Sequence, residues 1–523
     1  MDIFKTDGGE VRISMSFLGA NDGIVTGSGT LVKVTRGEDV RNILVDYGYF
    51  QGEDEELNYD RTLQGDDIDC ILLTHAHLDH CGAIPTLFKP IGDNVPYSGK
   101  IYASQETCAE AAHILMDAAY INEKKTLIFS NEIKKVKNEI TKKHLKAEKE
   151  GSKPQNIASL DSCMGAIEEQ EQRCLYTSIE AQEAIRSFEP VKVHARIEDN
   201  DFIPLFEGID ARFIPNSHIN GATMVELVVR YGEKHFTIVF SGDIGNSMSL
   251  LYRNIQYPIE PEYGDILVLE SLHGTSEPIE TLDESIRILW KTLKKAIKKR
   301  KTVIIPVFAL DRSAGFISLL NKIMDSGLWL NCYIDSPLAE KELMTYIGSY
   351  NDGDSAWFNY KVDKYPFRLD RFKIIENYAS HMIAAKYHGA NIFLTSSCMG
   401  YGGRVLDYFE QHIQDDDSIF IFPGFLPDKC PSKILHEAQH GSMVELNGRR
   451  YIKHCETIWL HGFSSHGYYE DKLNVIDRYP NLQTIFLNHG EDDSIEHLQK
   501  KLKKFYSADI IIPQMGEEFR IIW

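Results

Sequence analysis

The sequence lacks any apolar run that approaches the roughly 18–20 residues needed for a membrane-spanning helix. Its N-terminus lacks the basic and apolar regions of a secretory signal peptide. Its nine cysteines are odd in number and show no paired spacing, which argues against a disulfide scaffold. Together these absences predict a protein of a reducing compartment, the cytoplasm, with no membrane partner.

The chain is also short of positive charge. Lys and Arg total 56 against 77 Asp and Glu, which leaves a net charge of −21. Proteins that bind nucleic acid are usually basic, and this chain cannot attract a polyanion by its overall field. Any contact with nucleic acid must therefore be local, through metals, a few arginines or helix N-termini. Charge alone favours an enzyme that acts on small molecules.

At 523 residues the chain is too long for one hydrophobic core, and domains of roughly 100–250 residues imply two or three. Strands are predicted for much of the first 80 residues and again between residues 210 and 270. From Ile279 onward an amphipathic helix begins a regular alternation of helices and strands, which is typical of a parallel α/β unit. The change of pattern places a domain boundary near residue 275.

Helices are predicted in the first part of the chain as well. One begins after Ser104 and runs through Ala118, and another extends from Ser178 to Phe188. The segment Lys134–Lys153, rich in lysine and glutamate, is predicted to be a solvated helix or an insertion.

The most informative segment is His75–His80, with the sequence HAHLDH, directly after the largely apolar stretch Ile68–Leu73. Imidazole and carboxylate at this density suit a pair of divalent metals. Zinc binds nitrogen at about 2.0–2.1 Å, so its ligands must converge from a short rigid turn. The alternative is a polar turn with incidental histidines, and the strand before the cluster argues against it.

One cluster of six residues cannot complete two metal sites, so further ligands must lie at the ends of distant strands. His218, Asp243 and His489 each follow a predicted strand, and Asp46 ends another. Taken singly, such a histidine is more often a hydrogen-bonded core or surface residue, and such an aspartate is more often a turn cap. Taken together with the cluster, they predict a dinuclear metal site.

In their order along the chain these residues resemble the metallo-β-lactamase fold. The flavodiiron branch of that superfamily usually has glutamate where His77 stands, so the resemblance favours zinc over iron. Further segments are similar to the β-CASP nuclease branch, and the match runs from about residue 17 to about residue 515. These segments are Leu269–Ser271, Pro306–Arg312, Asp335–Ala339, Ser396–Arg404, Phe463–Gly467 and His489–Glu491.

The resemblance implies an α/β protein, a metallo-β-lactamase αββα sandwich with an inserted β-CASP α/β domain. Residues 1–275 would form the first part of the metallo-β-lactamase domain. Residues 276–455 would form the inserted domain, and residues 456–523 would complete the metallo-β-lactamase domain.

The resemblance also implies seven ligands for two zinc ions: His75, His77 and His218 for one ion, Asp79, His80 and His489 for the other, and Asp243 as a bridge. Asp46 would support the site from behind. Asp79, Glu270 and His466 would be the catalytic groups, and Glu270 would orient His466 and raise its pKa by ion pairing. DNA-acting members carry a small apolar residue at the position of His489, so a histidine there points to RNA.

Arg312 and Arg404 are candidates for contacting RNA phosphates, because guanidinium matches phosphate oxygens bidentately. The alternative for each arginine is a structural ion pair. The sequence departs from the family's usual pattern at Ser271–Gly274, where His273 stands for an aromatic residue, and at Gly424–Pro431, which is stiffened by prolines.

The function implied is a zinc-dependent ribonuclease that uses a metal-bridged hydroxide and leaves 5′-phosphate and 3′-hydroxyl ends. Three other functions stay open: a catalytically inactive scaffold in an RNA-processing complex, a hydrolase of small phosphodiesters or thioesters on the same fold, and cleavage of DNA, if His489 discriminates poorly between the two nucleic acids. The complete ligand set argues against the scaffold, and the inserted domain argues against small substrates. Endonuclease and exonuclease modes are both open, and a homodimer is implied by resemblance only.

Overall fold

The computed structural model describes residues 2–5, 11–90, 95–149, 174–253, 263–274, 278–308, 310–351, 353, 355–360, 366–424, 426–427 and 429–522. The predicted lysine- and glutamate-rich segment lies outside the described residues, apart from the backbone of a helix that continues to Lys149. Among the described residues no helix is both long and apolar enough to cross a membrane. The eight cysteines that the structure describes are all unpaired.

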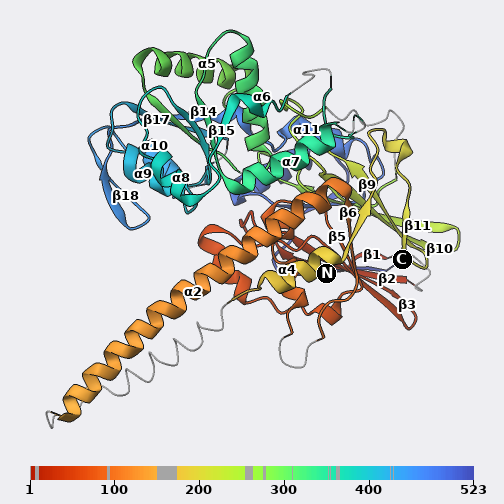
Figure 1. Cartoon of the computed structure of the whole chain (residues 1–523). Coiled ribbons are helices and arrows are strands. Elements are labelled where there is room, and N and C mark those ends of the chain that lie inside the picture. The colour runs from red at the N-terminus through yellow and green to blue at the C-terminus, as the bar shows by residue number, and fades with distance from the viewer. Residues whose placement is uncertain are drawn as a thin grey trace.

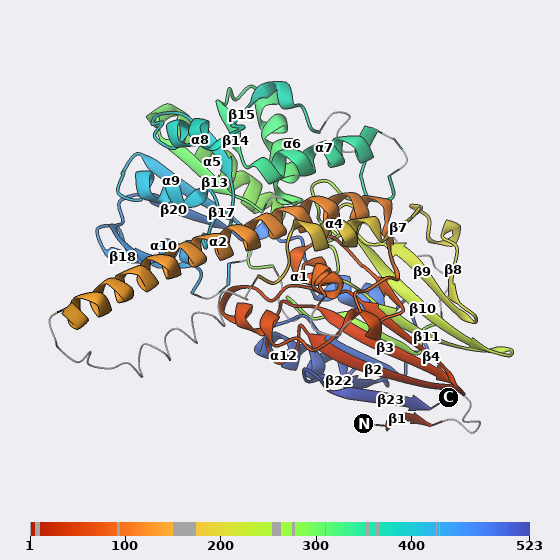
Figure 2. The ribbon, with the colours of Figure 1, turned by 60° about the horizontal axis from the view of Figure 1, so that its bottom comes forward.

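Two large sheets lie face to face (Figure 2). The first has the order β1-β23-β2-β3-β4-β5-β6-β7 and the second the order β22-β21-β12-β11-β10-β9-β8. The strands of the first sheet are β1 (Asp2–Lys5), β2 (Val11–Gly19), β3 (Gly29–Arg36), β4 (Asp39–Val45), β5 (Cys70–Leu72), β6 (Lys100–Ser104), β7 (Phe188–Val191) and β23 (Glu518–Ile522). Those of the second are β8 (Ile203–Phe206), β9 (Ile209–Pro215), β10 (Thr223–Tyr231), β11 (Lys234–Phe240), β12 (Ile266–Glu270), β21 (Thr484–Asn488) and β22 (Asp509–Ile511).

The main core lies between the two sheets. In β2 the alternate residues Val11, Ile13, Met15 and Phe17 are buried, as expected of a strand with one face toward a core. The second sheet is buried on both faces, since Leu267 and Leu269 of β12 point away from the first sheet and pack with residues of two helices. These helices are α11 (Tyr469–Ile476) and α12 (Asp492–Leu502).

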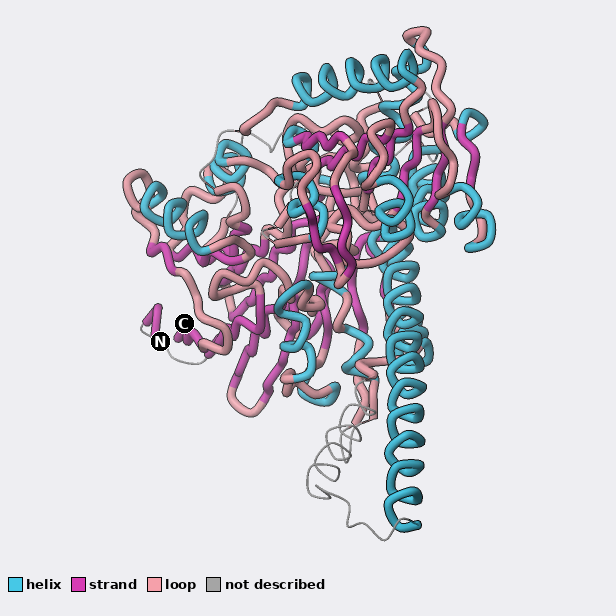
Figure 3. Tube along the Cα trace, turned by 90° about the vertical axis from the view of Figure 1, so that its left-hand side faces the viewer, coloured by secondary structure: helices cyan, strands magenta, loops and turns pink. Residues whose placement is uncertain are grey.

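Helices also cover the outer side of the first sheet. They are α1 (Leu78–Cys81), α2 (Gln105–Lys149) and α4 (Ser178–Arg186). The first part of α2 packs on α4, β6 and β7, and its remaining part projects from the body of the molecule (Figures 1 and 3). The predicted αββα sandwich is confirmed, although α2 is much longer than the helix expected after Ser104.

The inserted α/β domain is built on a third sheet in the order β15-β14-β16-β13-β17-β20, in which every neighbouring pair of strands is parallel. Its strands are β13 (Thr302–Pro306), β14 (Cys332–Asp335), β15 (Phe372–Ile374), β16 (Ile392–Thr395), β17 (Ser418–Pro423) and β20 (Glu456–Leu460), with a small hairpin of β18 (Met443–Leu446) and β19 (Arg449–Ile452). Its helices are α5 (Leu282–Lys299), α6 (Arg312–Asp325), α7 (Pro337–Asn351), α8 (Tyr378–Ala384), α9 (Val405–His412) and α10 (Pro431–Glu437).

One predicted domain boundary needs correction. Residues 456–460 were assigned to the last part of the metallo-β-lactamase domain, but as β20 they pair in parallel with β17 of the inserted domain. The sheet to which this strand belongs is not visible in the sequence, because it depends on pairing with a strand 37 residues earlier in the chain, where Ile419 lies opposite Glu456. The inserted domain therefore extends through Leu460. The boundary near 275 falls on residues 275–277, outside the described residues.

Candidate metal centre

The loop that carries the HAHLDH segment follows β5, and its last residues form the short helix α1. Asp46, at the end of the neighbouring strand β4, fastens this loop. One oxygen of its carboxylate accepts a hydrogen bond from the Thr74 amide at 2.8 Å, and the other accepts one from Thr74 Oγ1 at 2.8 Å. The same carboxylate lies 2.8 Å from Nδ1 of His80. Asp46 thus fixes both the loop and the orientation of one predicted ligand.

The backbone at this site is tightly constrained. Asp46 and His489 have φ angles of 57° and 52°, in the left-handed region that few non-glycine residues adopt. Gly48 lies so close to the loop that a Cβ there would come within 1.5 Å of the Asp79 carbonyl oxygen. Such local constraint is common where side chains must meet at a functional site.

The predicted ligands form two groups. His75, His77, His218 and Asp243 have ligand atoms that all lie within 4.8 Å of one another, and the same is true of Asp79, His80 and His489. Within the first group, His77 Nδ1 is 3.1 Å from Nε2 of both His75 and His218. Within the second, His489 Nε2 is 3.4 Å from Asp79 Oδ2. Segments separated by hundreds of residues therefore meet as the sequence predicts.

Asp243 stands between the two groups. Its Oδ2 lies 3.5 Å from Nε2 of His75 and 3.5 Å from Nε2 of His218. Its Oδ1 lies 3.1 Å from Nε2 of His80 and 3.5 Å from Nε2 of His489. One oxygen thus faces each group, which is the arrangement expected of a carboxylate that bridges two cations.

The ligand atoms of these residues are suited to binding divalent metal ions and do not satisfy one another by hydrogen bonds. Both oxygens of Asp243 and Nε2 of His80 are buried and have no hydrogen-bond partner among the described residues. Buried polar atoms without partners are rare in proteins and call for an explanation such as an ion. Imidazole nitrogen and carboxylate oxygen are the donors that zinc prefers. We conclude that the residues present fit two such cations.

The electrostatics of the first group agree with this conclusion. Burial lowers the pKa of His75 and His77 and brings the pKa of His218 to about 3, so these imidazoles are neutral. Burial opposes ionisation of Asp243, but the adjacent imidazoles of His489 and His80 hold the pKa of its carboxyl well below the ordinary value. Neutral imidazole and ionised carboxylate are the forms that bind metal. In the second group burial lowers the pKa of His80 and His489, but the carboxylate of Asp243 outweighs burial and raises both, so a cation there would displace a proton from each imidazole.

Glu270 and His466 form a third group beside Asp243. Glu270, at the end of β12, lies 2.9 Å from His466 Nδ1, and its second oxygen accepts a hydrogen bond from the Ile244 amide at 2.6 Å. His466 Nδ1 is also 3.8 Å from Asp243 Oδ2. Burial raises the pKa of Glu270 to about 7 against the opposing charge of Lys472, which is itself fully buried.

The prediction that Glu270 raises the pKa of His466 is wrong. Burial, together with the nearby imidazole of His218, lowers the pKa of His466 well below its ordinary value. The cost of placing an imidazolium in this interior exceeds the benefit of the pairing. Glu270 is nevertheless positioned to orient the His466 ring.

The two arginine candidates have different surroundings. Arg312, at the start of α6, lines a cleft between the domains together with His218 and Ser465, and its Nη1 donates to the Pro423 carbonyl at 2.9 Å. Arg404 is held in an ion pair with the buried carboxylate of Asp335 and donates to the Ile375 carbonyl at 2.8 Å. The described lining of that cleft does not include Arg404. Its contacts match the structural alternative rather than a phosphate contact.

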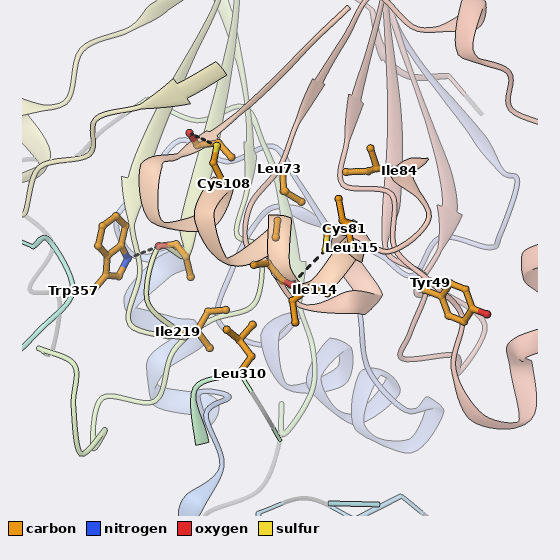
Figure 4. Packing of buried hydrophobic residues seen from close by; sticks show 14 of the residues in the cluster. Tyr49, Leu73, Cys81, Ile84, Cys108, Ile114, Leu115, Ile219, Leu310 and Trp357 are labelled. Carbon is orange, nitrogen blue, oxygen red and sulfur yellow. Dashed lines mark hydrogen bonds between the residues drawn. The ribbon is translucent and has the colours of Figure 1, made fainter. Parts of the chain in front are cut away.

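Sequence reasoning missed the residues through which the inserted domain holds the loop that carries His218. Trp357 Nε1 donates to the Ala222 carbonyl at 2.7 Å (Figure 4). The hydroxyl of Tyr252 accepts a hydrogen bond from the Asn220 amide at 3.0 Å and donates in turn to Asp311 at the start of α6. No motif marks these residues, because each acts through a partner distant in the sequence.

The comparisons with known proteins agree with the fold and the site. The family model described as "Metallo-beta-lactamase superfamily" matches residues 27–177, and the Beta-Casp domain model matches residues 316–432. A third model, described as "Zn-dependent metallo-hydrolase RNA specificity domain", matches residues 451–513. The three matches follow the order of the two parts of the sandwich and the domain inserted between them.

Several curated proteins are similar over most of the chain. Ribonuclease TTHA0252 of Thermus thermophilus is 24% identical over 91% of this chain and 94% of its own length. Probable RNase MJ4 of Methanocaldococcus jannaschii is 24% identical over 92% and 95%. Integrator complex subunit 11 of Danio rerio is 22% identical over 92% and 70%. The fold and the site define a metallo-hydrolase. Within that class, the chain carries matches to the metallo-β-lactamase and Beta-Casp models and is similar to proteins named as ribonucleases.

Proposed function

We propose that this protein is a zinc-dependent ribonuclease that hydrolyses RNA phosphodiester bonds and leaves 5′-phosphate and 3′-hydroxyl ends. The observation that carries the proposal is the position of Asp243, with one oxygen toward each of two groups of predicted zinc ligands. The ribonucleases among the similar proteins support RNA as the substrate.

His75, His77, His218 and Asp243 would hold one zinc ion, and Asp79, His80, His489 and Asp243 would hold the second. Such a pair would supply a water-derived nucleophile at neutral pH and would neutralise charge on the phosphate oxygens. Asp46 positions His80 from the side away from the ion, through its contact with Nδ1.

His466 would act on the substrate directly, and Glu270 would act through His466. The Glu270 carboxylate fixes the His466 ring through Nδ1, which leaves the other ring nitrogen for the scissile phosphate or the leaving 3′ oxygen. Arg312 lies at the cleft between the domains, where its guanidinium would bind a phosphate of the RNA backbone.

The cleft has a volume of about 50 Å³ in this structure. That volume accommodates about one or two water molecules and not a nucleotide. Entry of RNA past Arg312 and Phe316 therefore requires the inserted domain to move away from the sandwich.

The test is an assay with end-labelled RNA, using the full-length protein as purified, after treatment with a chelator, and after zinc is restored. We expect cleavage to be lost on chelation and regained with zinc, with 5′-phosphate and 3′-hydroxyl ends on the products. Arg450→Gln, at a side chain that is 72% exposed, serves as a control that leaves every predicted ligand in place. The ladder or internal fragments that result would also separate exonuclease from endonuclease action.

Three outcomes would contradict the proposal. Products with 2′,3′-cyclic phosphate would require attack by the RNA's own 2′-hydroxyl. Zinc binding without any cleavage of RNA would favour the scaffold. Faster turnover of a small phosphodiester than of RNA would favour the small-substrate hydrolase. The cytoplasmic location and the homodimer stay predictions, to be tested by fractionation and light scattering.

A further inference from the structure

A second group of metal-ligand side chains lies on the inserted domain. Asp416 is in the turn between α9 and β17, His440 precedes β18, and His454 follows β19. Their ligand atoms all lie within 4.8 Å of one another. The β18–β19 hairpin is at the outer edge of this domain, on the far side from α1 and the metal centre (Figures 1 and 2). This group is therefore separate from the predicted catalytic site.

The geometry points to a further binding site for a zinc-type divalent cation, formed by Asp416, His440 and His454. His440 Nε2 lies 2.8 Å from Asp416 Oδ1, and His454 Nδ1 lies 3.5 Å from Asp416 Oδ2. Two imidazoles and one carboxylate, with a water as fourth ligand, form a known donor set for zinc. Binding requires that the ring nitrogen of each imidazole that faces Asp416 carry no hydrogen, which a change of tautomer provides.

The backbone holds these ligands in place without a metal. The amide of His454 donates to the Ile413 carbonyl at 2.8 Å, which fixes the end of β19 against the segment that leads to Asp416. Near His440, the Gly441 amide donates to the Lys453 carbonyl at 2.6 Å. A cation would thus meet a preformed site and would not have to order a loose loop.

The site is open to solvent and lies in an acidic turn. The side chains of Asp416, His440 and His454 are 70%, 64% and 36% exposed, so a hydrated cation can reach all three directly. Asp415 and Asp417 flank Asp416 in the sequence and add negative charge. Both features favour capture of a cation from solution.

A neighbouring group of similar composition shows what a structural cluster looks like. His388, His412 and Asp415 also bring their ligand atoms within 4.8 Å. His412 is fully buried, however, and its ring nitrogens are engaged at 2.9 Å by Ser418 Oγ and at 2.8 Å by the Ala385 carbonyl. That histidine has no nitrogen left for a metal, so His388, which lies 3.1 Å from Asp415 of the same turn, is a matched control.

A cation at the proposed site would join the base of the β18–β19 hairpin to the α9–β17 turn. His440 and His454 lie on the two sides of the hairpin, and Asp416 lies on the turn. Occupancy of the site should therefore slow opening of the hairpin, and hydrogen exchange of its amides reports such opening.

The experiment compares full-length wild type with Asp416→Asn, His440→Gln, His454→Gln and the control His388→Gln, all carrying their resident metals. Each protein is equilibrated with buffered free Zn²⁺, and bound zinc per chain is measured by atomic emission. We expect wild type and His388→Gln to bind one zinc ion more than the other three variants. Zinc should also slow exchange of the amides of residues 443–452 in wild type and the control only.

Equal zinc content in wild type and the three variants would overturn the site. A hairpin whose exchange responds to zinc equally in all five proteins would overturn the assigned ligands. Both results are independent of the catalytic centre, because the ligands of that centre are unchanged in every protein compared. RNA cleavage should be the same in all five.

Discussion

Two buried polar regions of this molecule contain the same kinds of residue and differ in one respect. At the metal centre, the oxygens of Asp243 and Nε2 of His80 face other donors without a hydrogen-bond partner among the described residues. In the inserted domain, Asp335 pairs with Arg404 and lies 2.7 Å from His381 and 2.6 Å from Tyr408. In the first region these polar atoms have no partner among the described residues, which fits a bound cation. In the second region the carboxylate is paired with side chains of the protein itself.

The difference shows how a ligand group can be told from a structural one. Histidine and aspartate in proximity are common to both regions, so residue type alone does not decide. What decides is whether each buried polar atom has a hydrogen-bond partner, since an ion is needed only where such atoms remain without one. The Asp416 group differs from the His412 group in another way, since its ring nitrogens face the carboxylate of the same group, whereas those of His412 are engaged by Ser418 and the Ala385 carbonyl.

The largest effect is expected for Asp243→Asn. Replacing the bridging carboxylate by an amide removes a negative charge shared by both predicted ions, so RNA cleavage should fall by at least about 10³-fold. Zinc content should fall as well. Asp407→Asn makes the same change beside the Asp335 group of the inserted domain, and it should leave RNA cleavage and zinc content unaltered. Steady-state cleavage rates with metal analysis measure both, and full activity in Asp243→Asn would contradict the metal centre.

Asp335→Asn should act on stability instead of activity. The substitution leaves the guanidinium of Arg404 without its buried counter-charge, and breaking a pair of this kind costs about 3 kcal/mol or more of unfolding free energy. Chemical denaturation of wild type and variant measures the change. Zinc content of the folded variant should equal that of wild type, and a loss of zinc would show that the two regions are not separate.

Asp46→Asn should weaken metal binding without abolishing it. Asp46 contacts His80 on the nitrogen that faces away from the predicted ion, and such supporting contacts contribute about 10- to 100-fold in metal affinity. Competition with a zinc chelator gives the affinity directly. Asp69→Asn is the control, because Asp69 also holds β4, through the Asn42 amide at 2.7 Å, but lies away from the ligands.

The smallest effect concerns pH. Burial lowers the pKa of His381, but its hydrogen bonds with Asp335 and Asp407 outweigh burial and raise the pKa above the ordinary value. A histidine whose pKa is raised on folding stabilises the protein fully below its unfolded pKa of about 6.5. That stabilisation is lost as the pH rises through the folded pKa. Unfolding free energy should therefore decline above about pH 6.5 in wild type, and less steeply in His381→Gln.

His412 provides the contrast for this measurement. Burial lowers its pKa to about 4, so its contribution is lost as the pH falls below the unfolded value of about 6.5, and not as it rises. His412→Gln should leave the slope above that pH unchanged. If His381→Gln leaves the same slope as wild type, the paired imidazolium is not the cause of the decline.

The sequence predicts which side chains gather at the candidate metal centre, because the signal for each of them is local. Each lies at the end of a strand whose apolar pattern is visible, and strand ends of a sandwich meet at one edge. What the sequence does not show is which strands and which side chains pair with each other over long distances along the chain. The strand at 456–460 is visible, but not that it joins β17. Two arginines look equivalent, but only Arg404 finds Asp335, 69 positions away.

Burial is the second quantity that local patterns do not contain. The pairing of Glu270 with His466 is expected from motifs, whereas the lowered pKa of His466 follows from complete enclosure of the ring. The length of α2 is likewise not predicted from the sequence, since its second part projects beyond the body of the molecule (Figure 3).

The hydrogen bonds that join Trp357 and Tyr252 to the loop around His218 would link the entry of substrate to the geometry of the candidate metal centre. Residues of the inserted domain and its flank hold the two ends of that loop, at Ala222 and Asn220. If the inserted domain moves to admit a nucleic acid strand, the Trp357 contact would couple that movement to the loop of His218, a predicted metal ligand. The enzyme would then be most ordered, and best able to retain its metals, when the strand is seated and the two domains have come together again.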